Sequence, residues 1–413
     1  MKILHVVQRY PPAIGGGESW CAGVARWQAS AGHEVHVLCL RAVRDDDLWG
    51  DGPLEPGATA VGRADSEDGV TIERCAVARP AHRSTARLLA RAGLPTFART
   101  HSTEFYGVLV RRARAAHCVH AHAVPGPHVF AAWLAARLAR RPYVLTPHFH
   151  AGDSEHEAPA LRWLLRHADR VVPITAAEVD GLQARGVARD RITCASNAFS
   201  PSTGRPPVWS RDAVRAALAV PAGAPLLCCI GRKASTKGLD VLLRALPAIR
   251  HRPAPVLALA GPGTGWFRDL LRSTPSDHVR NLAPLPEDTK QALLAAADVV
   301  VLPSRFEAFG SVILESWAAG SPVIGADVPT VREVLGDAGV TFRAGDDLDL
   351  AARIDELLDA PETGRRLIER GRARLPLHTW ERVGAAVMAA YVTARAGAES
   401  ARALAAPRST TCR

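Results

Sequence analysis

The residues best suited to chemistry lie between positions 305 and 322. Glu307 and Glu315 stand on either side of the start of a predicted helix, 311–319. The first N–H groups of a helix have no partner within the helix and favour an anion. Two carboxylates beside such a helix start can accept hydrogen bonds from hydroxyl groups that flank a phosphate. For either glutamate alone, a solvated surface charge or a charge stabilised by the helix dipole is the simpler interpretation.

A second group of charged residues follows the predicted strand 226–230. Arg232 and Lys237 lie five positions apart in the segment 231–238, which opens the next helix. Such a pair suits a diphosphate, because arginine offers a planar fork and lysine a point charge. The spacing is not that of a phosphate-binding Walker A loop, and a polar loop with solvated cations stays open as an alternative. Together with the glutamates, the pair points to a ligand with hydroxyl groups on both sides of a diphosphate.

Glycines and histidines in the first half of the chain are further candidates. The turn Gly15–Gly17 lets backbone approach a ligand closely and adopt positive φ, although a plain strand-to-helix turn explains it equally well. His120 with His122, and His148 with His150, end two predicted strands. Side chains two residues apart share one strand face, so a metal site is one option. We expect none, because no carboxylate or thiol joins these histidines at ligand spacing.

Strands and helices alternate along two successive stretches of the chain. In the first, strands are predicted at 3–7, 34–40, 118–122, 143–146, 171–175 and 192–195, with a helix at 18–31. In the second, strands are predicted at 226–230, 256–260, 299–302 and 323–324, with helices at 239–250, after 265 and at 311–319. This alternation predicts an α/β protein of two doubly wound domains, in which ligands bind at the carboxyl ends of the strands.

The expected domain boundaries follow from changes in composition. They are 1–200 for the first Rossmann-like domain, 206–378 for the second, 379–396 for a C-terminal helix and 397–413 for a flexible tail. A proline- and glycine-rich segment, 198–225, reads as a linker with the entry to the second domain. The cleft between two such domains is the default place for a ligand.

The ordered set of motifs resembles the retaining GT-B glycosyltransferases of glycosyltransferase family four. The motifs are Tyr10-Pro-Pro, Gly15-Gly-Gly-Glu18, Gly32-His-Glu-Val35, Gly231-Arg with Lys237-Gly238, and Glu307-x7-Glu315, supported by Ser196-Asn197, Gly261-Pro-Gly263 and Asp298 to Ser304. The resemblance runs from about residue 3 to 385. It implies a GT-B fold, in which two Rossmann-like domains face each other across a cleft and the C-terminal helix returns to the N-terminal domain.

The resemblance also implies roles for individual residues. The donor would be bound by Gly16, Gly17, Arg232, Lys237, Glu307, Phe309, Gly310, Ser311 and Glu315. Arg232 and Lys237 would neutralise its diphosphate, Glu315 would bind the ribose and Glu307 the sugar hydroxyls. The catalytic set would be His122, Glu307, Arg232 and Lys237, and weaker candidates on the acceptor side are Gly15, Glu18, His148 and Asn197. No divalent metal or other cofactor is expected, since basic side chains and a helix end take the diphosphate charge.

The activity implied is transfer of a hexose-type sugar from a UDP- or GDP-sugar to a hydroxyl of a glycan, lipid or natural-product intermediate. Retention would follow from attack on the face that the leaving group vacates, with the diphosphate accepting the acceptor's proton. Two alternatives stay open, since a fold does not fix a function. One is an epimerase or phosphorylase-like reaction on the same scaffold. The other is a catalytically silent sugar-nucleotide-binding protein.

Composition adds weaker constraints on partners and location. The net charge of +10 favours anionic partners, but only four of the 51 basic residues are lysines, so a bias toward arginine explains part of it. The basic stretch 83–114 reads as a solvated helical face or a membrane-surface helix. No nucleic-acid motif is present. Eight cysteines without a CxxC pair, no signal peptide and no long apolar run indicate a cytoplasmic protein, with peripheral membrane contact as an option. The acceptor loops, including 41–66, and the oligomeric state stay open.

Overall fold

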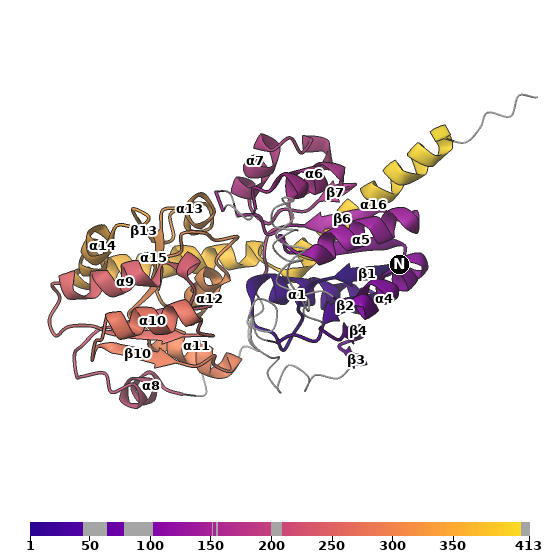
Figure 1. Ribbon diagram of the computed structural model, residues 1–413. Coiled ribbons are helices and arrows are strands. Elements are labelled where there is room, and N and C mark those ends of the chain that lie inside the picture. Colours follow the sequence, from indigo (N-terminus) through magenta and orange to yellow (C-terminus); the bar gives the residue numbers. More distant parts are fainter. Residues whose placement is uncertain (44–63, 78–101, 151, 154–155, 200–208, 406–413) are drawn as a thin grey trace, which may run out of the picture. The chain divides into compact units, whose positions relative to one another are not determined.

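The computed structural model describes residues 1–43, 64–77, 102–150, 152–153, 156–199 and 209–405 (Figure 1). The chain divides into two compact units. The first consists of Met1–Ser196 together with Trp380–Arg413, and the second of Asn197–Thr379. Both contain a parallel sheet covered by helices, so the prediction of an α/β protein with two doubly wound domains is confirmed.

The first unit is built on a sheet with the order β3-β4-β2-β1-β5-β6-β7. Its strands are β1 (Lys2–Val6), β2 (Glu34–Leu40), β3 (Ala64–Glu67), β4 (Val70–Cys75), β5 (Cys118–His122), β6 (Tyr143–Thr146) and β7 (Arg170–Val171). Its helices are α1 (Gly16–Ser30), α4 (Thr103–Ala115), α5 (Pro127–Leu138), α6 (Pro159–His167), α7 (Ala176–Ala184) and a 3₁₀ turn at Arg189–Arg191. All neighbouring strands run parallel except β3, which is antiparallel to β4. Apart from β3, whose residues 65–67 are exposed, the strands are largely buried, as expected for a sheet covered on both faces.

The winding of this sheet reverses between β1 and β5. The chain passes from β1 to β2 on one side, and later returns to β5 on the other side of β1, where His5 lies opposite His120. Doubly wound sheets bind ligands at such a reversal, outside the carboxyl ends of the strands. His122 is the last residue of β5, so it lies at this edge.

Several predicted elements of the first unit differ in the structure. The strand expected at 171–175 is only Arg170–Val171, and the one expected at 192–195 is reduced to a single bridge between Ile192 and Val171. Pro173 has no N–H to donate, which prevents a longer ladder. The antiparallel hairpin of β3 and β4 was not predicted, because β3 is short and polar and β4 contains only three buried apolar residues, Val70, Ile72 and Cys75.

The last helix, α16 (Trp380–Ala405), belongs to the first unit. It packs on α1 through two tryptophans, each of which fills the space over a glycine of the other helix. A Cβ on Gly23 would lie 2.0 Å from Trp380, and one on Gly384 would lie 2.0 Å from Trp27. The helix continues past residue 396, so the expected flexible tail is wrong for 397–405. The alanines of this segment favour a helix, and no proline interrupts residues 397–406.

The second unit has a six-stranded, fully parallel sheet with the order β10-β9-β8-β11-β12-β13. Its strands are β8 (Leu226–Ile230), β9 (Val256–Ala260), β10 (Val279–Leu282), β11 (Val299–Leu302), β12 (Val323–Ala326) and β13 (Val340–Phe342). Its helices are α8 (Arg211–Ala217), α9 (Leu239–Ala245), α10 (Gly265–Ser273), α11 (Glu287–Ala296), α12 (Ser311–Ala319), α13 (Pro329–Leu335), α14 (Asp347–Asp359) and α15 (Pro361–Arg374). Single 3₁₀ turns occur at Ser235–Lys237, Leu246–Ala248 and Leu375–Leu377. The winding reverses between β8 and β11.

Two predictions for the second unit need correction. The segment 198–225 is not all linker, because α8 forms at Arg211–Ala217 with Ser210 as its N-cap. The helix expected at 239–250 ends at Ala245, and a 3₁₀ turn follows. Pro247 explains this end, since proline removes a helical donor and clashes with the preceding turn.

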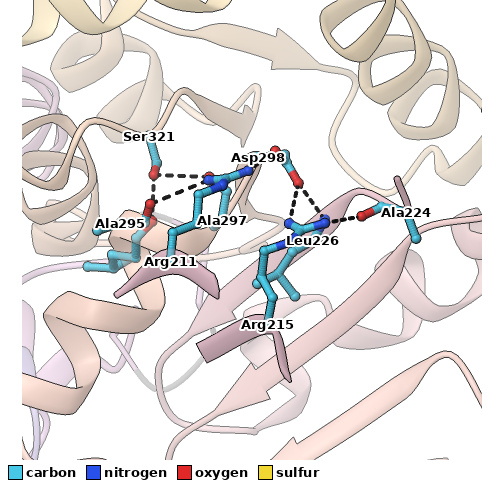
Figure 2. Close-up of polar contacts among 9 residues, drawn as sticks. Arg211, Arg215, Ala224, Leu226, Ala295, Ala297, Asp298 and Ser321 are labelled. Atoms are coloured by element: carbon cyan, nitrogen blue, oxygen red, sulfur yellow. Dashed lines mark hydrogen bonds and ion pairs between the residues drawn. The ribbon is translucent and has the colours of Figure 1, made fainter. Parts of the chain in front are cut away.

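Asp298 fixes the amino ends of the two central strands of this sheet. It directly precedes β11, and its carboxylate accepts a hydrogen bond of 2.7 Å from the N–H of Leu226, the first residue of β8. Arg211 and Arg215 from α8 pair with the same carboxylate, Arg215 at 3.0 Å (Figure 2). The pairing of β8 with β11 is thereby fixed at the edge opposite to the carboxyl ends.

Candidate active site

The loops after β8 and β11 touch each other at the carboxyl edge of the second sheet. Gly238 has a φ of +64°, and a Cβ there would lie 1.9 Å from the carbonyl oxygen of Pro303. Glycine is therefore required for both its conformation and this close approach. The N–H of Arg305 donates to the carbonyl of Thr236 at 2.9 Å. The two segments that the sequence singled out thus lie side by side where the winding reverses.

A charged clamp holds the β11 loop against α9. Arg305 donates two hydrogen bonds to the carboxylate of Asp240, at 2.7 and 2.6 Å. These hydrogen bonds lower the pKa of Asp240 to about 2, although burial opposes them. Such bidentate pairs fix geometry as well as charge. Arg305 therefore positions the loop that carries Glu307.

Lys237 and Glu307 form an ion pair at the centre of this arrangement. The Lys237 Nζ lies 2.7 Å from Glu307 Oε2, and both side chains are largely shielded from solvent. The Ser304 hydroxyl donates to the same oxygen at 3.1 Å, and Thr330 donates to the Glu307 carbonyl at 2.6 Å. The sequence predicted separate roles for the two residues, whereas the structure brings them into direct contact.

Arg232 and Lys233, two neighbouring cations of the loop after β8, lie in different environments. Arg232 is exposed, whereas Lys233 is buried with 5% of its surface accessible. The Lys233 Nζ donates to Asn281 Oδ1 at 2.6 Å and to the Leu282 carbonyl at 2.7 Å. Burial lowers the pKa of Lys233 to about 8. Lys233 therefore anchors its loop to β10, which leaves Arg232 and Lys237 as the cations for a ligand.

The start of α12 has the geometry expected of an anion site. Gly310 caps the helix with a φ of +84°, and Phe309 before it is buried. The Asn197 amide donates to the Ser311 hydroxyl at 2.8 Å, within the second unit. We expected Asn197 on the acceptor side. This contact instead places it beside the residues predicted to bind the donor, because the chain at 197 has already entered the second unit.

Glu315, one turn into α12, has a partner that the sequence did not reveal. Lys290 of α11 lies 3.0 Å from Glu315 and 2.9 Å from Glu287. Burial raises the pKa of Glu315 and is opposed by the Lys290 charge. Burial alone would lower the pKa of Lys290, but Glu315 and Glu287 outweigh it, so the pKa is raised. Lys290 thereby keeps the orientation of the Glu315 carboxylate fixed.

The glycine turn of the first unit lies at the start of α1. Gly16 and Gly17 form the first helical turn, and Gly15 is its N-cap with an extended φ of 175°. The expectation that these glycines need positive φ is wrong. A Cβ on Gly15 would lie 2.1 Å from Glu18 Oε2, so a larger residue there would force the Glu18 side chain to move. Glu18 in turn accepts two hydrogen bonds from Arg9, at 2.9 and 2.6 Å.

Three aromatic side chains and Gly17 meet beyond the ends of β5 and β6. A Cβ on Gly17 would lie 3.3 Å from the His148 ring. The ring of Trp20 lies 5.7 Å from that of His148 and 5.7 Å from that of His122. His148 has a positive φ of 48°, which is uncommon outside glycine. Burial lowers its pKa to about 4, so the ring is neutral at pH 7. The predicted residues of this unit are therefore brought together around Trp20.

Two clusters in the described part of the chain contain three potential metal ligands. In the first, His5, His120 and His122, five of the six ring nitrogens already form hydrogen bonds. In the second, His150, Asp153 and His156, the two rings are stacked at an interplanar angle of 1°. The lone pairs of stacked rings lie in parallel planes and do not converge on one ion. Neither geometry suits a metal as it stands, and the expectation that none is needed stays a prediction.

The basic stretch 83–114 lies partly outside the described residues, as does most of the loop 41–66. Within α4, Arg111 and Arg112 pair with Glu73 of β4, at 3.1 and 2.8 Å. This pairing suits a solvated helical face. Over the described residues, no helix is long and apolar enough to cross a bilayer.

Comparisons with known proteins agree with this arrangement. Residues 15–198 match the glycosyl transferase 4-like domain, and residues 210–374 match glycosyl transferases group 1. Glycogen synthase of Mycobacterium tuberculosis is 29% identical, over 96% of each chain. Phosphatidyl-myo-inositol mannosyltransferase of Propionibacterium freudenreichii is 30% identical, over 67% of this chain and 70% of its own.

Solved structures share the fold. HepE of Anabaena, in complex with UDP and glucose, superposes with a TM-score of 0.71 at 19% identity, over 94% of this chain and 98% of its own. Sucrose-phosphate synthase of Thermosynechococcus elongatus gives 0.69 at 18% identity, over 96% and 100% of the two chains.

Two doubly wound α/β units with a C-terminal helix that joins the first unit define a glycosyltransferase of the GT-B fold. The chain belongs to the family of glycosyl transferases group 1, as the motifs predicted, and is therefore an enzyme that transfers glycosyl groups.

Proposed function

We propose that this enzyme transfers a hexose-type sugar from a UDP- or GDP-sugar to a hydroxyl acceptor with retention of configuration. One observation carries the proposal. The loops after β8 and β11 meet where the winding of the sheet reverses, and there Lys237 and Glu307 lie 2.7 Å apart. A cation and a carboxylate at this distance suit a ligand in which a phosphate lies next to a hydroxyl-bearing sugar.

The donor is bound through complementary charges. Arg232, Lys237 and the first N–H groups of α12 receive the diphosphate, so Lys237 is shared between the phosphate and Glu307. The Glu307 carboxylate, oriented by Ser304, accepts hydrogen bonds from sugar hydroxyls. Glu315, held by Lys290, accepts from the ribose hydroxyls. Asn197 supports the helix start through Ser311.

The chemical step breaks the bond between the anomeric carbon and the diphosphate oxygen. Negative charge develops on the departing diphosphate, where Arg232, Lys237 and the helix end stabilise it. The acceptor oxygen bonds to the anomeric carbon on the face that the diphosphate vacates. Its proton passes to a phosphate oxygen of the leaving group, so no protein base is required. The two glutamates bind hydroxyls at opposite ends of the donor and are not an acid and nucleophile pair.

The first unit contributes the acceptor side of the reaction. We assign His122, which is buried and neutral, to the reacting sugar and the acceptor, and His148, Gly15 and Glu18 to the acceptor. Gly16 and Gly17, at the start of α1, are assigned to the donor. UDP-sugars are the first donors to test, because HepE was solved with UDP and glucose. We place the reaction in the cytoplasm, which suits the buried free cysteines of the described chain. We also propose that it needs no divalent metal.

A thermal-shift screen tests the donor site. UDP, GDP and their sugars are added to the protein in EDTA, and one nucleotide series should raise the melting temperature. Arg232→Ala and Glu315→Gln should abolish that shift. Arg272→Ala removes a cation from α10 whose side chain is 75% exposed, and it should keep the shift. Equal shifts in all three variants would show that the donor binds elsewhere.

Product analysis tests the reaction. With the donor so identified, release of the nucleoside diphosphate should depend on an added acceptor, and the new glycosidic bond should keep the donor's anomeric configuration. Release that never depends on an acceptor would refute transfer, and conversion of the donor into an isomer would indicate an epimerase. An inverted product would refute retention alone.

A further inference from the structure

A continuous chain of hydrogen bonds crosses the core of the first unit. It links six side chains, in the order His122, His5, Gln28, Tyr391, His120 and Thr146. The successive donor–acceptor distances are 2.8, 2.8, 3.2, 2.7 and 2.8 Å. All six side chains are fully buried, each with 0% of its surface accessible. The chain joins three strands, β1, β5 and β6, to α1 and to the C-terminal helix α16.

The amide of Gln28 determines the direction of these hydrogen bonds. Its oxygen faces His5 Nε2, so this nitrogen must carry a proton. A neutral imidazole has one N–H, and His5 Nδ1 is therefore an acceptor. Burial lowers the pKa of His5 to about 4, which keeps the ring neutral. His122 must then donate from Nε2 to His5, which leaves its Nδ1 with a lone pair.

The other end of that amide binds Tyr391. The Gln28 Nε2 group donates to the Tyr391 hydroxyl. The hydroxyl then donates a hydrogen bond to His120 Nδ1, and His120 donates from Nε2 to Thr146. With the amide oxygen on His5, all five hydrogen bonds therefore run in one direction, from His122 to Thr146.

The His122 end of the chain is incomplete. Its Nδ1 is buried and has no hydrogen-bond partner among the described residues. A buried polar atom without a partner is costly and rare in native structures. Burial, followed by the neighbouring histidines, lowers the pKa of His122 well below 6.5, so Nδ1 stays unprotonated. An unprotonated Nδ1 can accept a hydrogen bond from a hydroxyl but cannot donate one.

We propose that Tyr391, Gln28 and His5 are positioning residues that hold His122 in its Nε2–H tautomer, so that Nδ1 accepts a hydrogen bond from a substrate hydroxyl. The inference rests on the proposed function of His122. It makes the C-terminal helix, through one hydroxyl group, part of the acceptor-side machinery. It also implies that His122 selects a hydroxyl over a hydrogen-bond acceptor at the same place on the substrate.

Tyr391→Phe and Tyr143→Phe form a matched pair of tests. Each removes one hydroxyl from a tyrosine with 0% of its surface accessible, but the Tyr143 hydroxyl donates to the Val129 carbonyl at 2.9 Å and has no place in the chain. Only Tyr391→Phe releases the Gln28 amide to turn over and so reverse the direction of the hydrogen bonds at His5 and His122. Gln28→Met breaks the chain itself and should reproduce the effect of Tyr391→Phe.

The tautomer of His122 is measured on the protein without substrate, so the result does not depend on the proposed function. In protein labelled with ¹⁵N-histidine, long-range ¹H–¹⁵N correlations distinguish protonated from unprotonated ring nitrogens. The wild type and Tyr143→Phe should show His122 protonated at Nε2 alone. Tyr391→Phe and Gln28→Met should show a mixture of tautomers. A wild type protonated at Nδ1, or an unchanged tautomer in Tyr391→Phe, would overturn the proposal.

Steady-state kinetics then test whether the tautomer matters for transfer. In Tyr391→Phe, kcat for nucleoside diphosphate release should fall roughly tenfold, the worth of about one net hydrogen bond, with an unchanged KM for the donor. Tyr143→Phe should keep the wild-type kcat. A mixed tautomer with unchanged kcat would show that the hydrogen-bond chain has no role in transfer. Absence of transfer by the wild type would instead refute the proposed function. The tautomer measurement would still show whether the chain fixes the protonated nitrogen of His122.

Discussion

The two units share one winding but line the reversal of their sheets with opposite chemistry. In the second unit the edge carries charges on loops, such as Lys237 and Glu307, which are paired and partly accessible. In the first unit it carries neutral imidazoles on strands, such as His5 and His122, which are fully buried. Charge suits a site where a phosphate must be held and released. A fixed neutral lone pair suits a site that must orient a hydroxyl.

Acidification should produce the largest difference between the two units, because it should lower the free energy of unfolding of the first unit more than that of the second. Burial lowers the pKa of His5, His128 and His148 to about 4 in the folded state, whereas an unfolded histidine titrates near 6.5. The unfolded chain therefore binds protons first, and the free energy of unfolding of the first unit falls as the pH drops from 6.5 toward 4. Each histidine contributes about 1.4 kcal/mol per pH unit.

Urea unfolding at pH 7, 6 and 5, followed by pulse-labelling hydrogen exchange and mass spectrometry, separates peptides of the two units. Peptides of the second unit are the internal control. Equal losses of stability in both units would show that the buried histidines are not responsible.

Removal of Lys237 should have the next largest effect, on catalysis. Lys237→Ala takes away one preorganised cation from the departing diphosphate, and kcat should fall about 10²–10³-fold, by analogy with loss of an oxyanion donor. Nucleoside diphosphate release measures this directly. Arg272→Ala again controls for loss of a positive charge, and a wild-type kcat in Lys237→Ala would remove Lys237 from the reaction.

Lys233 offers a test inside the second unit, since its side chain is more deeply buried than that of Lys237. Its pKa is about 8 when folded and near 10.5 when unfolded, so the unfolded state binds more protons between these values. The contribution of Lys233 to stability should therefore rise as the pH increases from 8 to 10.5, by on the order of 3 kcal/mol.

The measurement is the difference in free energy of unfolding between wild type and Lys233→Met at pH 7.5, 9 and 10. This difference should change with pH, whereas the corresponding difference for Lys2→Met, at an exposed ion pair of the first unit, should stay constant. A constant difference for both variants would mean that Lys233 is not desolvated as its contacts indicate.

The smallest effect concerns the packing of α16 on α1. Gly384→Ala places a methyl group 2.0 Å from Trp27, and overpacking of this kind costs about 1–3 kcal/mol. Gly397 lies on the same helix with nothing within 4 Å of its added Cβ, so Gly397→Ala should be neutral or stabilising by up to about 1 kcal/mol. Thermal melting compares the two. An equal effect at both positions would contradict the interlocked packing.

The residues that we assign to the donor were selected from the sequence because their signals are local. Arg232, Lys237 and Glu307 lie in the loops that follow two buried strands, and the helix from Ser311 to Ala319 has the predicted bounds. Lys290 was missed because it reaches Glu315 from another helix. A clue existed, however. In a chain with 47 arginines and four lysines, three of the lysines lie at the site loops or on α11 beside them. Lysine is a compact charge, and Lys233 and Lys290 are both buried among neighbours.

The acceptor side could not be read in the same way. His122 is hydrogen-bonded to His5, which is linked through Gln28 to Tyr391, 269 residues further along the chain than His122. Only the folded core shows that these side chains meet. The fold itself was predictable from the alternation of strands and helices. Its deviations, such as the hairpin of β3 and β4 and the end of α9 before Pro247, depend on edge pairing and on single residues.

The split of the first unit has a consequence for biosynthesis. A ribosome delivers the chain from its amino end, and the second unit, Asn197–Thr379, emerges as one uninterrupted stretch. The first unit is completed later, since Val387, Ala390 and Tyr391, which are buried in it, are made only after the whole second unit. During that interval α1 exposes the surface that Trp380 will cover. A nonsense codon at Trp380 would therefore leave the first unit without part of its core, although all of its strands had already been made.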